Sequence, residues 1–289
     1  MSLSSAALES SEATPDDVAP SRIIRPRRGW IQIDLAELVR YRDLLWFLTK
    51  RDISLRYKQT ALGVAWAVIQ PLATMAVFTI FFGRFGKIPS DGVPYPLFAF
   101  CGLIPWQLFA YALSESSNSL VNNQSLVTKV YFPRLVIPLS AVLSGLMDLV
   151  VSSVILVAML AWFGKVPTIA VLLIPAFVAL AIIAALGVGL WLSALNVQYR
   201  DIRYTIPFLT QIWFFATPIA YPASLVPEKF RALVGLNPMA GVVEGFRWAL
   251  LGTARPGGVI WVSIAVTFTV LVGGLYYFSR MERRFADIV

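Results

Sequence analysis

The stretch VNNQSLVTKVYFPR, residues 121–134, separates two long apolar runs with polar and basic residues. It begins with amides at Asn122 and Asn123 and ends with Pro133 and Arg134, after which the second apolar run starts. Its middle has apolar residues spaced for one or two helical turns. Each flanking run is long enough to cross a bilayer, which takes about 20 residues. The stretch therefore predicts a short helix between two membrane spans, with an ordinary solvated loop as the simpler alternative.

The composition is that of an integral membrane protein. Apolar residues make up 58% of the 289 residues, charged residues make up 14%, and the mean hydropathy is +0.72. Soluble domains carry about 25% charged residues. The net charge of +8 indicates contact with anionic membrane lipid rather than nucleic acid, because the basic residues cluster beside the spans. With no histidine and one cysteine, the chain has no set of ligands for a zinc site, and we expect no metal.

The hydropathy pattern predicts an all-α integral membrane protein with six transmembrane helices, an N-terminal amphipathic interface helix and two short re-entrant periplasmic helices between the fifth and sixth spans. Residues 1–33 are predicted to be a disordered cytoplasmic tail, and residues 34–289 to be the transmembrane domain. The interface helix is expected over 34–58. The expected spans are about 61–82, 95–117, 135–163, 168–195, 205–221 and 259–279.

The distribution of basic residues predicts the orientation. Of the 24 lysines and arginines, 17 fall on the same side as the N-terminus and 7 on the opposite side. Because cytoplasmic loops carry the excess of Lys and Arg, both termini and residues 121–134 are expected in the cytoplasm.

The connection between the fifth and sixth spans carries signals for two short helices. Pro227 is a helix start, and Asn237 is a cap for a second helix that ends at Gly252. That second helix, of about 14 residues, would be about 21 Å long, too short for a hydrocarbon core of about 30 Å. Helix ends at membrane depth must be covered by protein or face water, so this connection predicts a pore mouth or gate on the outer side. The residues expected at this gate are Pro227, Asn237, Pro238, Gly241 and Gly245, the last two forming a GxxxG pattern that permits close packing.

No catalytic or nucleotide-binding motif is present in the sequence. The segment GRFGK, residues 83–87, has the wrong spacing for a phosphate loop and lacks the Ser or Thr after the lysine. Two acids, Glu115 and Asp148, fall within expected spans, where a carboxylate is by default a candidate for function. A proton-coupled transporter is one interpretation, and helix capping or contact with a partner is the other.

Five segments carry a resemblance to a known family. They are RDISLRYKQTALGVAWAVIQPLATM (51–75), LVTKVYFPRLVIPLSAVLSGLMD (126–148), LSALNVQYRDIRYTIPFLTQIWFFATPIAYP (192–222), LNPMAGVVEGFRWALLG (236–252) and RMERRFADI (280–288). Together they resemble the ABC-2 type permeases that export bacterial polysaccharides. The resemblance covers about residues 34–289 and is strongest to O-antigen exporters, with capsule and teichoic-acid exporters as relatives.

The resemblance implies a homodimer in the bacterial inner membrane, bound to two copies of a separate ATPase that uses ATP and Mg. The chain itself would bind no cofactor and would not be an enzyme. The substrate would be an undecaprenyl-diphosphate-linked glycan, most similar to O-antigen. Residues 122–132 would form the coupling helix seated in the ATPase. The coupling residues would be Asn122, Leu126, Val127, Lys129, Tyr131, Phe132 and Arg134. The family resemblance also implies that the paired short helices within residues 224–252 form a periplasmic gate.

Two further groups of residues follow from this resemblance. Arg51, Arg56 and Lys58 would meet the lipid diphosphate headgroup, with ordinary contact to anionic lipid as the alternative. Aromatic residues in the spans would line a glycan channel, with an interfacial aromatic belt as the alternative. The channel residues would be Trp66, Phe78, Phe82, Trp106, Phe109, Phe214, Phe215 and Tyr221. An ABC-2 exporter of another substrate (capsule, teichoic acid or drug) and a membrane glycan-processing enzyme remain alternative functions.

Overall fold

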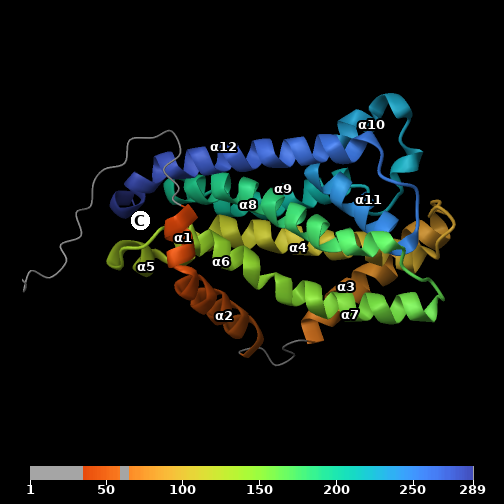
Figure 1. The fold of residues 1–289 in the computed structure, drawn as a ribbon, viewed down its shortest axis with the longest axis horizontal. Helices are drawn as coiled ribbons and strands as arrows, with labels where there is room; N and C mark the ends of the chain where they lie inside the picture. The colour runs from red at the N-terminus through yellow and green to blue at the C-terminus, as the bar shows by residue number, and fades with distance from the viewer. Residues whose placement is uncertain (1–34, 59–64, 289) are drawn as a thin grey trace, which may run out of the picture.

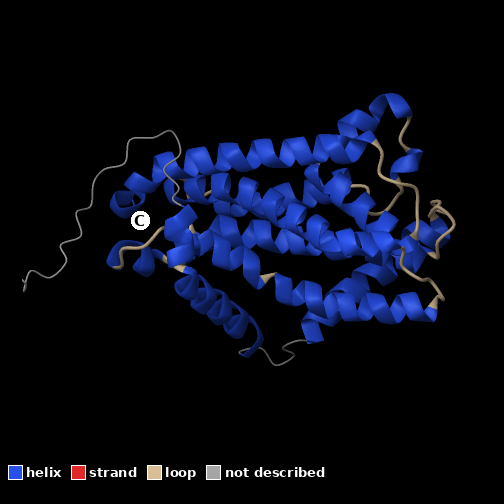
Figure 2. Ribbon diagram, viewed as in Figure 1, coloured by secondary structure: helices blue, strands red, loops and turns tan. Residues whose placement is uncertain are grey.

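The computed structural model describes residues 35–58 and 65–288, and every regular element in these ranges is a helix (Figures 1 and 2). The expected tail, 1–33, and the first residues of the expected first span lie outside the described residues. In chain order the helices are α1 (Leu35–Arg40), α2 (Arg42–Lys58), α3 (Ala65–Phe78), the π-helix η2 (Thr79–Phe85), α4 (Tyr95–Asn122), α5 (Gln124–Lys129), α6 (Val136–Ser144), α7 (Leu146–Trp162), the 3₁₀-helix η3 (Ile169–Leu173), α8 (Ile174–Gln198), α9 (Ile202–Ala216), the 3₁₀-helix η4 (Ala223–Leu225), α10 (Glu228–Gly235), α11 (Pro238–Leu251) and α12 (Gly258–Ile288).

Five stretches of helix in the described ranges are long and apolar enough to cross a membrane. They are Ala65–Phe85, Tyr95–Asn122, Val136–Trp162, Ile169–Gln198 and Gly258–Glu282. The expected span 205–221 differs, because α9 has 15 residues and is therefore about 22 Å long. The chain leaves the helical conformation at Thr217 (φ −94°, ψ 136°). The structure is thus that of a multi-pass membrane protein with five candidate spans in the described ranges and a shorter α9 in place of the expected fifth span.

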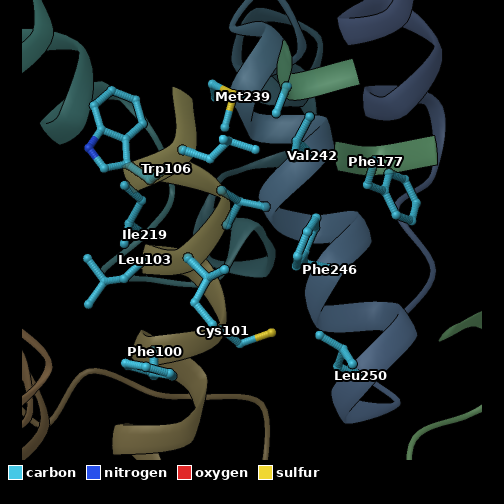
Figure 3. Packing of buried hydrophobic residues seen from close by; sticks show 14 of the residues in the cluster. Phe100, Cys101, Leu103, Trp106, Phe177, Ile219, Met239, Val242, Phe246 and Leu250 are labelled. Carbon is cyan, nitrogen blue, oxygen red and sulfur yellow. The ribbon is translucent and has the colours of Figure 1, made fainter. Parts of the chain in front are cut away.

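Helix α4 is the inner helix of the bundle. In its apolar segment 78% of the residues are buried, against 33% or less in the other four candidate spans. This burial comes from neighbours on several sides, because α4 packs against α6, α7, α8 and α11. Figure 3 shows α4 next to α11, with Leu103 and Trp106 of α4 and Val242 and Phe246 of α11 among the side chains of one hydrophobic cluster.

The two ends of the bundle differ in their elements (Figure 1). One end, called the α5 end below, carries α1, α5 and the C-terminal part of α12. The opposite end, the α10 end, carries α10, the N-terminal part of α12 and the loop after η2. Expected bounds of the short helices agree with the structure, since Asn237 caps α11 and Gly252 ends it with a left-handed φ of 69°.

A buried arginine, which the sequence analysis did not single out, joins the segment after α9 to the core. The side chain of Arg247 on α11 is 1% exposed, and its guanidinium donates hydrogen bonds to the carbonyl oxygens of Pro218 (2.7 Å) and Ile219 (2.6 Å). It also pairs with Glu244 at 3.2 Å and lies 3.6 Å from the ring centroid of Phe98 on α4. The guanidinium therefore supplies donors to carbonyl groups that lie outside any helix and are buried in the protein.

Replacement of Arg247 by alanine is expected to destabilise the fold strongly. The change leaves Glu244 and two carbonyl groups buried without their donor, which costs about 3–5 kcal/mol for a broken buried pair. The measurement is thermal unfolding of the purified protein in detergent. The matched control is Arg231→Ala on α10, whose partner Glu228 is 89% exposed; its cost is expected to stay within about 1 kcal/mol. Equal shifts in the two variants would contradict the assignment.

Candidate functional site

The stretch between the second and third expected spans contains a shorter helix than the sequence predicted. Helix α5 has six residues, Gln124–Lys129, while Asn122 is the last residue of α4. Val130 is extended (φ −127°, ψ 135°), and the chain stays outside a helix up to Pro133, since a proline disfavours the helical conformation in the residue before it. The expected coupling helix over 122–132 is therefore wrong in its bounds.

One side of this stretch is buried in the protein's own core. Val127 is 3% exposed and Phe132 is 6% exposed. Both belong to a hydrophobic cluster, called the α5-end cluster below, which includes Leu48 of α2 and Phe285 of α12. In this structure the two side chains hold the stretch on α2 and α12, and their contact with a partner stays a prediction.

The other side of the stretch is open to solvent. Tyr131 is 73% exposed and Val130 is 53% exposed, which is unusual for side chains of this size. Leu126 is partly buried and packs against the α5-end cluster. The exposed residues, called the α5 face below, are Asn122, Gln124, Ser125, Thr128, Lys129, Val130 and Tyr131. Three of the expected coupling residues, Asn122, Lys129 and Tyr131, are part of this face.

Arg134 holds the end of the stretch on α12. Its backbone N–H donates to the Glu282 carboxylate (3.2 Å), and its guanidinium donates to the Glu282 carbonyl oxygen. The guanidinium also lies 5.9 Å from the ring centroid of Phe285. Arg134 was expected to couple to a partner. In this structure its guanidinium contacts Glu282 and Phe285 of the same chain.

The three basic residues predicted for a headgroup have different surroundings on α2. Arg51 donates to Asp52 (2.8 Å) and to the side-chain oxygen of Asn123 (2.9 Å). Arg56 forms an ion pair with Asp148 of α7 at 2.6 Å. Lys58, the last residue of α2, is exposed. Two of the three cations therefore already have anionic partners in the chain.

Asp148 connects α2 to the break between α6 and α7. Its carboxylate accepts hydrogen bonds from Arg56 and from the hydroxyl of Tyr57, and Arg56 also lies 4.1 Å from the ring centroid of Tyr111 on α4. Burial and the bond to Asp148 raise the pKa of Tyr57 above its usual value. Helix α2 therefore packs along α6 and is tied to the bundle at its far end. The carboxylate serves in an ion pair, which is a different role from an isolated proton carrier.

Five of the predicted channel aromatics gather into one cluster. Phe78 contacts Phe82 (centroids 5.1 Å apart) and Phe214 (5.6 Å), and Trp106 contacts Phe214 (5.5 Å) and Phe109 (5.4 Å). The rings come from α3, η2, α4 and α9, which the tertiary structure alone brings together. The other three predicted residues are placed differently: Trp66 and Phe215 are exposed and Tyr221 is partly buried.

An open groove of about 350 Å³ lies beside this cluster, between α4 and α9. Trp106 and Phe214 give it aromatic walls, and polar groups come from Ser114, Thr210 and Gln211. The polar residues were missed because a single hydroxyl or amide in an apolar run has no motif. Thr210 and Gln211 come four and three positions before Phe214, a spacing that places all three on one face of a helix. This spacing was the signal available in the sequence. Aromatic faces with a few hydroxyl and amide groups suit a ligand rich in hydroxyl groups.

The predicted gate residues lie in intrachain packing at the α10 end. The Asn237 side chain accepts from the Met239 N–H (3.0 Å) and from the Trp213 indole (2.9 Å), and so joins α9 to α11. Gly241 packs on Ser263 of α12, and Gly245 packs on the ring of Phe177. Pro238 is buried as the first residue of α11, and Pro227 precedes α10 and is exposed. The GxxxG pattern therefore packs α11 against α8 and α12 of the same chain.

Comparison with known proteins identifies the family. Residues 43–251 match the model of the family described as ABC-2 type transporter. The chain belongs to this family. The membership predicted from the sequence is thus confirmed, and this ABC-2 type transporter is a permease subunit of the kind that the resemblance implied.

Relatives of this ABC-2 type transporter are similar over nearly their whole length. The O-antigen export system permease protein RfbA of Myxococcus xanthus is 31% identical over 257 residues, which cover 88% of this chain and 98% of that protein. RfbA of Klebsiella pneumoniae is 29% identical over 248 residues (86% and 95%). The polysialic acid transport protein KpsM of Escherichia coli is 25% identical over 241 residues (80% and 91%).

Removal of the Asp148 carboxylate is expected to loosen α2. In Asp148→Ala, amide hydrogen exchange of α2 should become about ten-fold faster or more, since a hydrogen bond to a charged group contributes about 1.5–3 kcal/mol and about 1.4 kcal/mol is a factor of ten. The control is Asp43→Ala, which removes an exposed pair with Arg42 on the same helix. If amide hydrogen exchange over α2 is unchanged in Asp148→Ala, the contacts of Asp148 with Arg56 and Tyr57 do not hold α2 on the bundle.

Proposed function

We propose that this chain is the membrane permease of an ATP-driven exporter that moves lipid-linked polysaccharide, with O-antigen on undecaprenyl diphosphate as the substrate, across the bacterial inner membrane. The observation that carries the proposal is the similarity over 86–88% of the chain to permeases named for O-antigen export. The similarity to KpsM makes a capsular polysaccharide the second candidate substrate.

The groove between α4 and α9 supports a carbohydrate substrate. Aromatic faces such as those of Trp106 and Phe214 offer flat apolar surfaces, and Thr210 and Gln211 offer hydrogen-bond partners beside them. A chain of sugars that slides past needs such sequence-tolerant contacts more than it needs a closed pocket. We place the glycan path along this groove.

A second copy of the chain fits the exposed faces of α3 and α9. Phe208, Ile212 and Phe215 are exposed on α9, and Ile69 and Val77 are exposed on α3. A path beside α9 is enclosed only when another surface covers it, since backbone and polar side chains at this depth need protein or water as neighbours. The proposed assembly is a homodimer that binds two ATPase subunits and is surrounded by membrane lipid.

The energy of export would come from the partner ATPase, which uses ATP and Mg. The sequence lacks a phosphate loop, and the distribution of basic residues favours a cytoplasmic α5 end. We therefore assign the α5 face to the ATPase. The lipid diphosphate would approach beside α2, where Lys58 is exposed and available to an anion.

Deletion of this gene in its host is expected to abolish the surface polysaccharide while the undecaprenyl-linked glycan accumulates at the inner membrane. The measurement is extraction of lipid-linked glycan together with surface staining, and complementation with the wild-type chain restores both. A Phe214→Ala, Gln211→Ala double variant should restore export about ten-fold less well, given about 1–1.5 kcal/mol for the lost contacts. The control Trp162→Ala changes an exposed aromatic residue away from the groove. Loss of glycan synthesis itself would instead support an enzyme.

Replacement of Tyr131 by alanine is expected to reduce co-purification of the ATPase about ten-fold, because a buried interface tyrosine typically contributes 1 kcal/mol or more. Val127→Ala tests the buried side of the stretch. It should lower the free energy of unfolding by about 1–3 kcal/mol, because it leaves a cavity in the α5-end cluster. The loss in the free energy of ATPase binding should be smaller than this. The control Trp261→Ala removes an exposed aromatic residue at the α10 end. Undiminished ATPase binding by Tyr131→Ala would remove Tyr131 from the docking surface.

A further inference from the structure

Helix α12 contacts both of the regions assigned to work in export. Its 31 residues give a length of about 46 Å, and it runs from the α10 end to the α5 end of the bundle (Figure 1). It packs against α10 and α11 near its start and against α5 near its end. A single straight element thus connects the two ends.

At the α10 end, Ser263 of α12 joins both short helices. Its side chain is fully buried, and its hydroxyl accepts a hydrogen bond from the Gly241 N–H at 3.2 Å. The same oxygen lies 3.1 Å from the carbonyl oxygens of Gly235, at the end of α10, and of Asn237, at the cap of α11. A Cβ on Gly241 would lie 2.7 Å from the Ser263 Cβ, so glycine permits this close approach.

At the α5 end, the same helix holds the stretch that carries the α5 face. Glu282 accepts from the Arg134 backbone, and Phe278 and Phe285 pack with Val127 and Phe132 in the α5-end cluster. Glu282 follows Ser263 by 19 positions in the sequence, a distance of about 28 Å along the helix axis.

Between these ends α12 is suited to transmit displacement. The helix contains no proline, so its hydrogen-bond ladder has no obligatory break. Its middle packs on α8, where a Cβ on Gly187 would meet the backbone of Leu271 at 2.9 Å. Packed interiors have low compressibility and transmit strain. A displacement of one end of α12 is therefore not taken up by deformation of its contact with α8.

We propose that α12 is the element that couples the ATPase docking region to the α10–α11 pair, and that Arg134, Glu282 and Ser263 are positioning residues for export. Displacement of the α5 face moves Glu282, and Ser263 then moves the adjoining ends of α10 and α11. The inference rests on the proposed function, because it assigns a route by which the work of the ATPase reaches the far side of the membrane.

Helix α4 is the competing route, since it continues through Asn123 into α5 and also packs on α11. It is buried along most of its apolar length, whereas 17% of the apolar segment of α12 is buried. The exposed side of α12 faces lipid or a partner and gives it room to move. The two routes differ in one consequence: Glu282 and Ser263 matter only if α12 is used.

The test uses the complete permease–ATPase complex in liposomes that contain the lipid-linked glycan. The variants are Glu282→Ala, Ser263→Ala and the double variant. Each single change is expected to leave ATP hydrolysis within about two-fold while the glycan exported per ATP falls about five-fold. The double variant should be no worse than the lower single variant, because both changes interrupt one link.

The matched control is Ser279→Ala. Ser279 is buried on the same helix, and its hydroxyl makes no hydrogen bond within the described residues, so its loss should leave the export per ATP unchanged. A readout independent of transport is the distance between spin labels at Lys87 and Lys229, both exposed at the α10 end. This distance should change on ATP binding in the wild type and stay fixed in Glu282→Ala.

The outcomes separate the inference from the function on which it rests. A wild-type complex that hydrolyses ATP and exports no glycan would refute the proposed function. A wild-type complex that exports, together with Glu282→Ala and Ser263→Ala variants that export equally well per ATP, would refute only the role of α12. If the fold losses of the two single variants multiply in the double variant, Glu282 and Ser263 act independently, and this would also refute their role in one link through α12.

Discussion

The need to satisfy buried backbone carbonyl groups outside helices governs the α10 end of this protein. Helix α9 ends at Ala216, and the residues after it have no helical neighbours for their carbonyls. Arg247 supplies those donors from α11, while Asn237 joins α11 to α9. Without Arg247 the carbonyl groups of Pro218 and Ile219 would lose their side-chain donor. The predicted gate is therefore held by specific polar contacts as well as by packing.

The α5 end shows a different constraint, which is to keep a short element folded while one of its faces stays exposed. A helix of six residues is not stable by itself. Val127 and Phe132 attach the stretch to α2 and α12, and this leaves Tyr131 and its polar neighbours exposed. The same contacts that stabilise the stretch join it to the helices that run through the bundle. The position of the α5 face thus depends on one hydrophobic cluster.

Two carboxylates of the bundle are paired with arginines. Asp148 meets Arg56, and Glu244 meets Arg247. In a medium of low dielectric constant a charge without a partner is costly, and a pair with additional hydrogen bonds is tolerated. The cations of α2 that could attract an anionic headgroup are therefore partly occupied by the chain's own carboxylates, and Lys58 is the one of the three predicted residues that is exposed.

The sequence by itself determined the class of protein, the positions of most helices, the caps of α11 and the family. Hydropathy, capping residues and local motifs depend on neighbours in the chain, so they can be read without a structure. The tertiary structure decided which face of each helix is buried. It turned Val127 and Phe132 inward, paired Arg56 with Asp148, gathered Phe78, Trp106 and Phe214 from distant segments, and shortened α9. These outcomes depend on contacts between residues far apart in the chain, and an apolar run around a whole helix does not state which side faces protein and which faces lipid.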